Sequence, residues 1–177
     1  DHDSHYFRWN TTAQLTEEAQ EQIRSVLITR KAIKPENIVI ADSDGNEKDT
    51  MAGMGNLIAM RTNGRGNSGA VLEILLSYEN GKVKVKTEYN IRRVLGCVVD
   101  EIHLCDGTSV TDVSLLPSVY FTLGHDETTG TYPIYGGGYG HGVGMGQNAA
   151  EGMAKQGYTY KDILNFFFQN ITIQVKG

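Results

Sequence analysis

Apolar residues recur with two different periods along the chain, and the change of period separates helical from extended segments. Near the N-terminus, apolar positions three or four residues apart predict one helix. Those positions are Leu15, Ala19, Ile23, Val26 and Leu27. Thr11 or Thr12 is the expected N-cap, and the helix must end before Pro35 because a residue preceding proline disfavours helical backbone.

From residue 38 onward, short apolar runs alternate with turn residues, which predicts a series of strands. The expected strands are residues 37–41, 56–61, 70–78, 82–89, 98–104, 118–123, 131–135 and 171–175. Asn80-Gly81 is a strong hairpin signal, because both residues accept the positive φ of a tight turn. Residues 90–96 are expected to form a short helical turn closed by Gly96.

One stretch departs from both periods. Residues 135–147 read Tyr-Gly-Gly-Gly-Tyr-Gly-His-Gly-Val-Gly-Met-Gly-Gln. From residue 138 to residue 146, glycines alternate with four side chains: Tyr139, His141, Val143 and Met145. In an extended backbone this order predicts four side chains on one face and bare main chain on the other. A bare face admits close approach by a ligand, another strand or an aromatic ring, so we predict that this stretch is the functional centre.

Two helices are predicted after the glycine-rich stretch. The first begins near Gln147 and ends at Gly157, and its free N-terminal amides point back at the glycines, where an anion or polar ligand could dock. Its apolar positions are Ala149, Ala150, Met153 and Ala154. Thr159 and Asp162 form a capping box for the second. That helix is expected to bury Ile163, Leu164, Phe167 and Phe168.

The fold class that these elements predict is α+β. We expect a twisted, mostly antiparallel sheet with an N-terminal helix and two C-terminal helices, within one domain over residues 1–177.

Composition narrows the range of functions. The chain has 177 residues and a formal charge of −5, from 16 basic and 21 acidic residues, which argues against nucleic acid as a partner. No apolar run approaches the roughly 20 residues that span a bilayer. The glycine-rich stretch lacks both a Gly-Lys-Ser/Thr sequence and a βαβ context, so it does not predict a nucleotide site. Because the chain starts at Asp1 without a methionine, we expect a processed protein or a piece of a longer one.

Four further features leave alternatives open. Tyr6, Phe7, Arg8 and Trp9 are either a packing anchor or a platform for a planar or sugar ligand, with Tyr6 and Arg8 expected on the face opposite Phe7 and Trp9. The first residues, with His2 and His5 beside Asp1 and Asp3, are either a frayed terminus or a divalent-metal site. Cys97 and Cys105 are either a hairpin disulfide or plain thiols. No cofactor and no metal site are predicted; Cys97, His103 and Cys105 together lack a fourth ligand.

Several motifs together resemble the stage II sporulation protein D (SpoIID) family, which includes amidase-enhancer (LytB) proteins. The glycine run from Gly138 to Gln147 and the helices after it match the family's C-terminal signature. Three further segments match in order: residues 6–9 (Tyr-Phe-Arg-Trp), residues 91–96 (Ile-Arg to Leu-Gly) and residues 116–121 (Leu-Pro-Ser to Phe). The resemblance therefore spans nearly the whole chain.

The resemblance implies an exported or membrane-anchored, extracytoplasmic protein of the bacterial cell envelope. The activity implied is lytic transglycosylation of peptidoglycan: one carboxyl group assists cleavage of the MurNAc–GlcNAc linkage, and a 1,6-anhydro sugar is left, with preference for glycan stripped of stem peptides. The family's catalytic glutamate precedes the Tyr-Phe-Arg-Trp segment. It would therefore lie upstream of Asp1, and no catalytic residue is assigned within this chain. The family's Gly-Met-Ser-Gln is Gly-Met-Gly-Gln at residues 144–147, so if the serine hydroxyl touches substrate in relatives, that contact is absent here.

We therefore predict a fragment of such an enzyme that forms part of its glycan-binding groove. The residues expected to line the groove are Tyr6, Arg8, Tyr139, His141 and Gln147. Its expected partners are peptidoglycan glycan strands, and either the missing N-terminal segment of the same domain or other cell-wall hydrolases. A non-catalytic peptidoglycan-binding or amidase-enhancer module is the alternative, and a scaffold without a ligand is a third.

Overall fold

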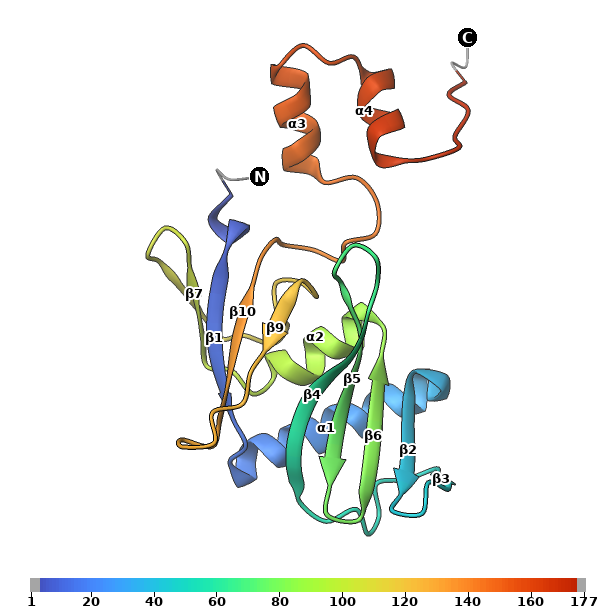
Figure 1. Ribbon diagram of the computed structural model, residues 1–177, viewed down its shortest axis with the longest axis vertical. Coiled ribbons are helices and arrows are strands. Elements are labelled where there is room, and N and C mark those ends of the chain that lie inside the picture. Colours follow the sequence, from blue (N-terminus) through green and yellow to red (C-terminus); the bar gives the residue numbers. More distant parts are fainter. Residues whose placement is uncertain (1–3, 175–177) are drawn as a thin grey trace.

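The computed structural model describes residues 4–174, and within them it confirms the α+β fold class. The strands form two five-stranded antiparallel sheets rather than one (Figure 1). The first sheet has the order β8-β7-β1-β10-β9. Its strands are β1 (Trp9–Gln14), β7 (Glu101–Leu104), β8 (Ser109–Thr111), β9 (Phe121–Leu123) and β10 (Thr131–Gly136).

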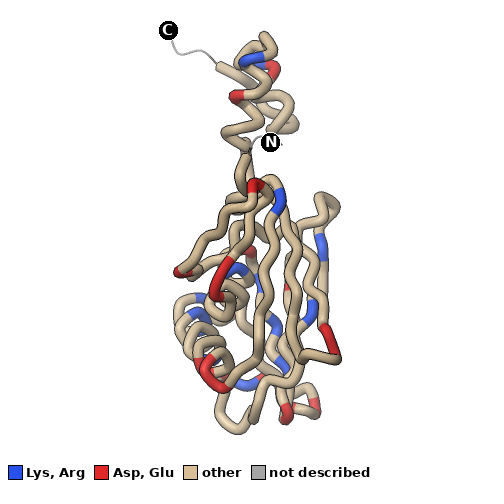
Figure 2. Tube along the Cα trace, turned by 90° about the vertical axis from the view of Figure 1, so that its left-hand side faces the viewer, with Lys and Arg blue, Asp and Glu red and all other residues tan. Residues whose placement is uncertain are grey.

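The second sheet has the order β3-β2-β6-β5-β4. Its strands are β2 (Ile38–Asp42), β3 (Glu47–Lys48), β4 (Leu57–Arg65), β5 (Val71–Tyr78) and β6 (Gly81–Lys86). Helices α1 (Glu17–Ile33) and α2 (Glu88–Gly96) pack on one face of this sheet, as the view of Figure 2 shows edge-on. The predicted hairpin is confirmed, since β5 and β6 pair directly, but its two turn residues are Glu79 and Asn80, because Gly81 already pairs with Tyr78 as the first residue of β6.

The beginning of the chain differs from the sequence prediction. Thr11 and Thr12 lie in β1, not at a helix cap, because β1 pairs with β10 along its whole length and with β7 at its start. The true N-cap of α1 is Thr16, whose hydroxyl accepts a hydrogen bond from the Ala19 amide at 3.1 Å. Pairing with the distant strand β10 therefore determines the conformation of Thr11 and Thr12, which the local sequence pattern had assigned to a helix cap.

One hydrophobic core joins both sheets with α1 and α2. Ile23 and Leu27 of α1 are fully buried, and so are Ile74 and Leu76 of β5. From the first sheet, Tyr132 and Ile134 enter the same core. The two sheets therefore form a single packed body, which holds the edges of the candidate site in fixed positions.

Other boundaries also shift. Strand β4 extends through Arg65, four residues beyond the predicted end, with irregular pairing near Gly64. Strand β7 begins at Glu101, not at residue 98, and strand β9 at Phe121, not at residue 118. Two short 3-10 turns, η1 (His5–Phe7) and η2 (Pro35–Asn37), were not predicted.

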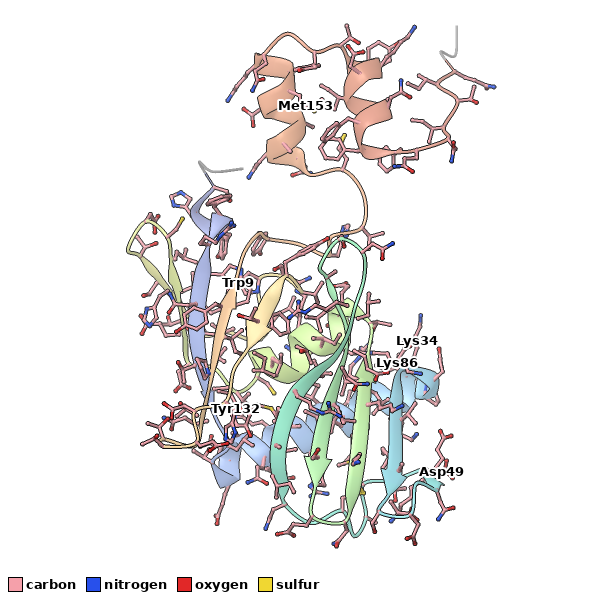
Figure 3. The ribbon with its side chains drawn as sticks, in the orientation of Figure 1. Trp9, Lys34, Asp49, Lys86, Tyr132 and Met153 are labelled. Carbon is pink, nitrogen blue, oxygen red and sulfur yellow. The ribbon has the colours of Figure 1, made fainter. Side chains whose placement is uncertain are left out.

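The last two helices, α3 (Gln147–Lys155) and α4 (Tyr160–Phe167), pack on each other and stand away from the sheets (Figure 1). The predicted start at Gln147, the left-handed Gly157 and the Thr159–Asp162 capping box are all confirmed. The predicted burial is wrong: neither helix has a buried residue, Ile163, Leu164 and Phe167 are only half-buried, and Phe168 is exposed. Met153 of α3, labelled in Figure 3, is only half-buried.

The final strand predicted over residues 171–175 is also wrong, because residues 171–174 form no strand. Residue 175 lies outside the described residues. Within residues 4–174, no helix combines the length and apolar character that crossing a bilayer requires.

Candidate functional site

A groove of about 1240 Å³ runs between the N-terminal segment, β9, β10 and the glycine segment, which we define as residues 136–146. All five residues predicted for the site lie along it: Tyr6, Arg8, Tyr139, His141 and Gln147. Tyr6 and Tyr139 are 133 positions apart in sequence, so the fold brings together what the sequence separates. The structure therefore assembles the predicted residues, although their role in binding stays a prediction.

The glycine segment is not the extended strand that its alternation predicted. After β10 ends at Gly136 the chain makes successive bends, and every second residue from Gly138 to Gly144 is a glycine with positive φ. The values are 80° at Gly138, 125° at Gly140, 72° at Gly142 and 116° at Gly144. L-residues rarely adopt such backbone, so glycine is required there for conformation. The expected single face of four side chains does not form.

Close approach of aromatic rings explains other glycines. A Cβ atom on Gly136 would collide with the indole ring of Trp9, which lies beside β10 (Figure 3). A Cβ atom on Gly142 would lie 2.9 Å from the ring of Tyr120. The bare backbone was expected to admit a ligand, another strand or an aromatic ring. At Gly136 and Gly142, an aromatic ring approaches it.

Backbone hydrogen bonds fix the glycine segment to the body. The Gly138 amide donates to the Tyr6 carbonyl at 2.7 Å, and the Gly140 amide donates to the Pro117 carbonyl at 2.8 Å. The Trp9 indole donates to the Gly138 carbonyl at 3.2 Å. The Ser118 hydroxyl donates to the Gly137 carbonyl at 2.7 Å. The segment is therefore held on one side by the N-terminal residues and on the other by residues 117–118.

Helix α2 supports that second side. Its buried Arg92 donates from Nε to the Leu116 carbonyl at 2.7 Å and from a terminal nitrogen to Glu88 at 2.9 Å. A Cβ atom on Gly96 would lie 2.6 Å from Cα of Leu115, so this glycine allows the helix end to touch the following segment. Residues 91–96 thus contact residues 115–116, and the neighbouring residues 117–118 bond to the glycine segment.

Aromatic side chains are prominent in the groove. Tyr6 and Tyr139 have ring centroids 4.5 Å apart, with planes tilted by 40°. Tyr139 is 71% exposed and Tyr135 is 62% exposed, so both rings are open to a ligand. The predicted alternation of residues 6–9 is wrong, because His5–Phe7 form the 3-10 turn η1 and all four residues line the groove. Trp9 is buried, as a packing anchor would be.

His141 is exposed, and its imidazole has a defined tautomer when neutral. Its Nδ1 accepts a hydrogen bond from the Val143 amide at 2.9 Å. The proton of the neutral ring is therefore on Nε2, which can donate to an oxygen of a ligand. Gln147, the first residue of α3, is also exposed and supplies an amide group at the end of the groove.

The groove is positively charged although the whole chain is acidic. Arg8 and Arg65 line it, whereas no aspartate or glutamate lies among its described lining residues. Arg65 of β4 donates to the Phe121 carbonyl of β9 at 2.7 Å and to the Gly69 carbonyl at 2.9 Å, so it also links the two sheets. Arg8 donates to the Phe7 carbonyl and lies over the Phe7 ring.

Arg65, Tyr120 and Tyr135 also line the groove, although the sequence motifs did not predict them as site residues. Arg65 lay in a stretch predicted as loop, and the two tyrosines lay in predicted strands. The glycine pattern does not indicate which side chains of other elements face it, and the proximity of β4 and β9 brings Arg65 and Tyr120 to the groove. Tyr135 lies in β10, directly before the glycines.

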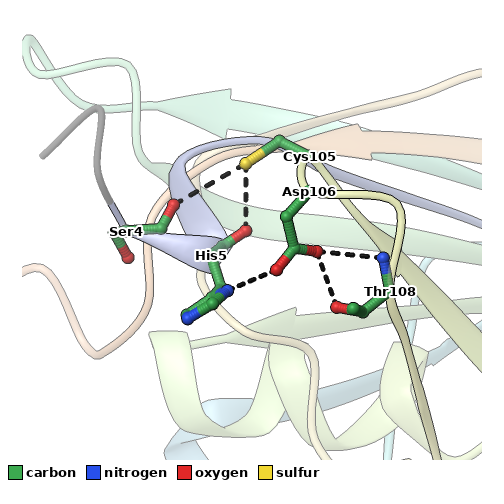
Figure 4. Close-up of polar contacts among 5 residues, drawn as sticks. All are labelled: Ser4, His5, Cys105, Asp106 and Thr108. Carbon is green, nitrogen blue, oxygen red and sulfur yellow. Dashed lines mark hydrogen bonds and ion pairs between the residues drawn. The ribbon is translucent and has the colours of Figure 1, made fainter.

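A polar cluster holds the N-terminal segment at the groove rim (Figure 4). His5 forms a hydrogen-bonded ion pair with Asp106, whose other oxygen accepts from the Thr108 hydroxyl at 2.6 Å. Hydrogen bonds from Thr108 and His5 hold the pKa of Asp106 well below its usual range. The Cys105 thiol donates to the His5 carbonyl at 3.2 Å. This cluster attaches η1, which carries Tyr6, to the turn after β7.

Both cysteines are free thiols, so the disulfide alternative is wrong for this structure. Burial raises the pKa of Cys97 to about 11, whereas Cys105 is exposed. Within residues 4–174, no group of three histidine, cysteine or acidic side chains is placed to hold a metal ion. The suggested site of His2 and His5 with Asp1 and Asp3 lies mostly outside the described residues; His5 itself pairs with Asp106.

Comparison with known proteins gives a partial match. The chain is 33% identical over 85 residues to an amidase enhancer of Bacillus subtilis, which covers 48% of this chain and 11% of that protein. It is 31% identical over 97 residues to an uncharacterized protein of Brachyspira hyodysenteriae, which covers 54% of this chain and 26% of that protein. No protein-family model matches.

This chain is a distant, partial homologue of an amidase enhancer. It spans only a minor part of the length of the curated relatives it matches. This homology agrees with the motifs, which resemble a family that includes amidase enhancers. Because the match is partial, it does not assign the activity of the whole relative to this chain.

Proposed function

We propose that the groove binds peptidoglycan glycan strands, and that the chain is the substrate-groove part of a SpoIID-type lytic transglycosylase. One observation carries the proposal: a groove with exposed tyrosines, bare glycine backbone and arginines, and no acid among its described lining residues. Sugar rings stack on aromatic faces, and close backbone approach suits a flat polymer. Muramic acid also carries a lactyl carboxylate, which Arg8 or Arg65 can pair with once the stem peptide is removed.

The reaction needs a carboxylic acid that protonates the leaving oxygen, after which the C6 hydroxyl of the same sugar attacks the oxocarbenium-like centre. The resemblance puts the family's catalytic glutamate before the Tyr-Phe-Arg-Trp segment, so we propose that this acid lies on a further segment of the parent protein. A groove without a carboxyl group among its described lining residues is compatible with that proposal. The residues of this chain would hold and orient the glycan: Tyr139 by stacking, His141 through Nε2–H, and Gln147 through its amide.

The surface of α3 and α4 supports the need for such a partner. Helices of nine and eight residues are marginal by themselves, and their stability usually comes from packing of an apolar face. Here Phe166 and Phe168 remain exposed, and neither helix packs on the sheets. We place the acid-bearing segment, or another cell-wall hydrolase, against this pair. The protein would act at the cell envelope, outside the cytoplasm.

A second candidate function is a non-catalytic peptidoglycan-binding module that enhances an amidase. The homology with an amidase enhancer favours it, and a groove without a described acid is compatible with it. The two candidates share the glycan-binding groove and differ in whether a parent protein cleaves the glycan.

Glycan strands stripped of stem peptides test both candidates. We expect the purified chain to bind them in sedimentation assays and to release no anhydro-muramyl product. His141→Ala should weaken binding about tenfold, or about 1.4 kcal/mol. His103→Ala is the matched control, because His103 is exposed but lies outside the groove.

Absence of binding would overturn the groove proposal, and anhydro products from this chain alone would overturn the placement of the acid. A parent protein that carries the upstream segment should release anhydro products if the first candidate is correct. If it releases none, while the chain accelerates a purified amidase on cell walls, the second candidate is correct.

A further inference from the structure

The outer face of the second sheet carries a row of cations. Lys82, Lys84 and Lys86 alternate along β6, the central strand, and Arg61 lies on β4. Because side chains alternate across a strand, these lysines point away from Val83 and Val85, which are fully buried under α1 and α2. The cations therefore project from the face that the helices leave uncovered.

The strand register fixes how these cations lie. Lys84 is paired with Val39 on one side and Leu75 on the other, and Leu75 is paired with Arg61. Leu75 is only 4% exposed although it faces outward, as expected if the long stems of its neighbours lie over it. Along β6, alternate residues are about 6.6 Å apart, so the three lysines start from a regular line of Cα atoms.

These four cations make no ion pair or side-chain hydrogen bond within residues 4–174. Many other basic side chains do bond to protein groups. They are Arg8, Arg24, Arg30, Lys31, Lys48, Arg65, Arg92, Arg93 and Lys155. The outer sheet face thus concentrates cations whose charges the described protein groups do not neutralise.

Two acidic residues share this face, one towards each edge. Glu73 is paired with Lys86 in register, but its carboxylate accepts a hydrogen bond from the Asn63 side-chain amide. Glu47 is paired with Ala41 on the edge strand β3. Four cations against two carboxylates leave this face at about +2, in a chain whose total charge is −5.

We propose that this face binds a linear phosphodiester polymer without bases, of the poly(glycerol phosphate) type. The ammonium groups of evenly spaced lysines are point charges that accept phosphates at many angles, which suits a flexible polymer with one charge per repeat. Charge complementarity is the basis of the proposal, and it does not depend on what the groove binds.

Two other polyanionic partners fit less well. Single-stranded nucleic acid is bound through aromatic side chains that stack on bases, and the paired residues between these cations are Val39, Leu75, Ser77 and Ala41. An anionic membrane is usually held by apolar insertion as well as charge, whereas Leu75, the large apolar residue paired directly with Lys84, is buried. The exposed Ile58 lies apart from the lysine row, at the irregular pairing of edge strand β4.

The test uses the full chain and fluorescently labelled poly(glycerol phosphate) of defined length. We expect saturable binding whose log Kd rises with log salt concentration with a slope of about 2 to 3, as for four phosphate contacts. The triple variant K82Q/K84Q/K86Q should bind at least tenfold more weakly. The control R93Q/K155Q/K161Q removes the same charge from helices α2, α3 and α4, away from this face, and should bind within about twofold of wild type.

Circular dichroism and glycan binding of the triple variant check that it folds and that its groove is intact. No binding of the polymer, or an equal loss in both triple variants, would overturn the proposal. Tighter binding of an oligothymidylate of equal charge, or binding only to vesicles with 30% phosphatidylglycerol, would also overturn it in favour of those partners.

Discussion

The ring of Tyr6 packs on the ring of Tyr139, with centroids 4.5 Å apart, and this contact joins the N-terminal turn to the glycine segment. A backbone hydrogen bond from the Gly138 amide to the Tyr6 carbonyl lies directly beside it. The two tyrosines therefore act as one aromatic surface whose halves come from opposite ends of the chain.

Removal of either tyrosine should weaken glycan binding, and the two losses should not be additive. Tyr6→Ala removes the support of Tyr139 as well as its own ring, so Tyr139→Ala should cost less in a Tyr6→Ala background. We expect a coupling of about 0.5–1.5 kcal/mol, typical of aromatic pairs. Isothermal titration calorimetry with a muramyl tetrasaccharide measures the cycle, and simple additivity would contradict a shared surface.

Gly136→Ala should destabilise the protein by about 1–3 kcal/mol, because the added methyl group collides with the buried indole of Trp9. Trp9 is the only tryptophan, so its fluorescence during urea unfolding reports on this site directly. Gly64→Ala is the matched control, since its Cβ atom would meet nothing within 4 Å and its φ is not positive. Equal effects of the two substitutions would show that the indole contact is not responsible.

Arg65→Gln should reduce the preference of the groove for carboxylate ligands. We expect wild type to bind a muramyl oligosaccharide with a free lactyl carboxylate several-fold more tightly than its methyl ester, since charge-assisted hydrogen bonds contribute about 1.5–3 kcal/mol. In the variant this preference should be smaller, because only Arg8 then remains to pair with the carboxylate. Arg61→Gln, on the same strand but outside the groove, should retain the preference. An unchanged preference in Arg65→Gln would exclude this role.

The two thiols should react at very different rates with a disulfide reagent at pH 8. With the pKa of Cys97 raised to about 11 by burial, only about 0.1% of this thiol is ionised, and the thiolate is the reactive form. Cys105 is exposed and should react first. Cys97→Ser identifies the slow phase. Finding no reactive thiol before reduction would instead indicate the disulfide that this structure does not contain.

Asp106→Asn should loosen the N-terminal turn. The pKa of Asp106 is lowered by Thr108 and His5, so its contribution to stability is present above about pH 4, where an unfolded-chain aspartate titrates, and is lost as the pH falls through the lowered pKa. Hydrogen exchange over residues 4–8 should accelerate in the variant at pH 7, and in wild type only at pH values below the usual aspartate range. Asp44→Asn, in an exposed turn, should change neither.

Much of the fold followed from local pattern. The Thr159–Asp162 capping box, the hairpin between β5 and β6 and the α3 start at Gln147 each depend on residues close in sequence, and each was predicted. Thr11 and Thr12 were misassigned because their conformation depends on pairing with β10, more than 120 residues away. Burial of α4 was overestimated, because amphipathic spacing gives a helix an apolar face without specifying what packs on it.

In the candidate site, too, some residues could be predicted from local motifs and others depend on tertiary packing. The five predicted groove residues came from two motifs, whereas Arg65 and Tyr120 reach the groove only through tertiary packing. The extended conformation predicted for the glycine segment failed for a physical reason. A period of two implies a strand for residues confined to negative φ, but glycine is equally stable at positive φ, so its alternation carries no such implication.

The left-handed backbone at Gly138, Gly140, Gly142 and Gly144 also determines which sequences this segment tolerates. If all four codons were randomised and functional clones recovered, glycine should return at each of them. Asparagine is the leading substitute only at residue 138, because φ at residues 140 and 144 lies beyond the region that asparagine tolerates and a Cβ atom at residue 142 would meet the Tyr120 ring. The intervening positions 139, 141, 143 and 145 are free of that backbone constraint, so ligand preference can be re-engineered there by side-chain replacement while the main-chain path is inherited unchanged.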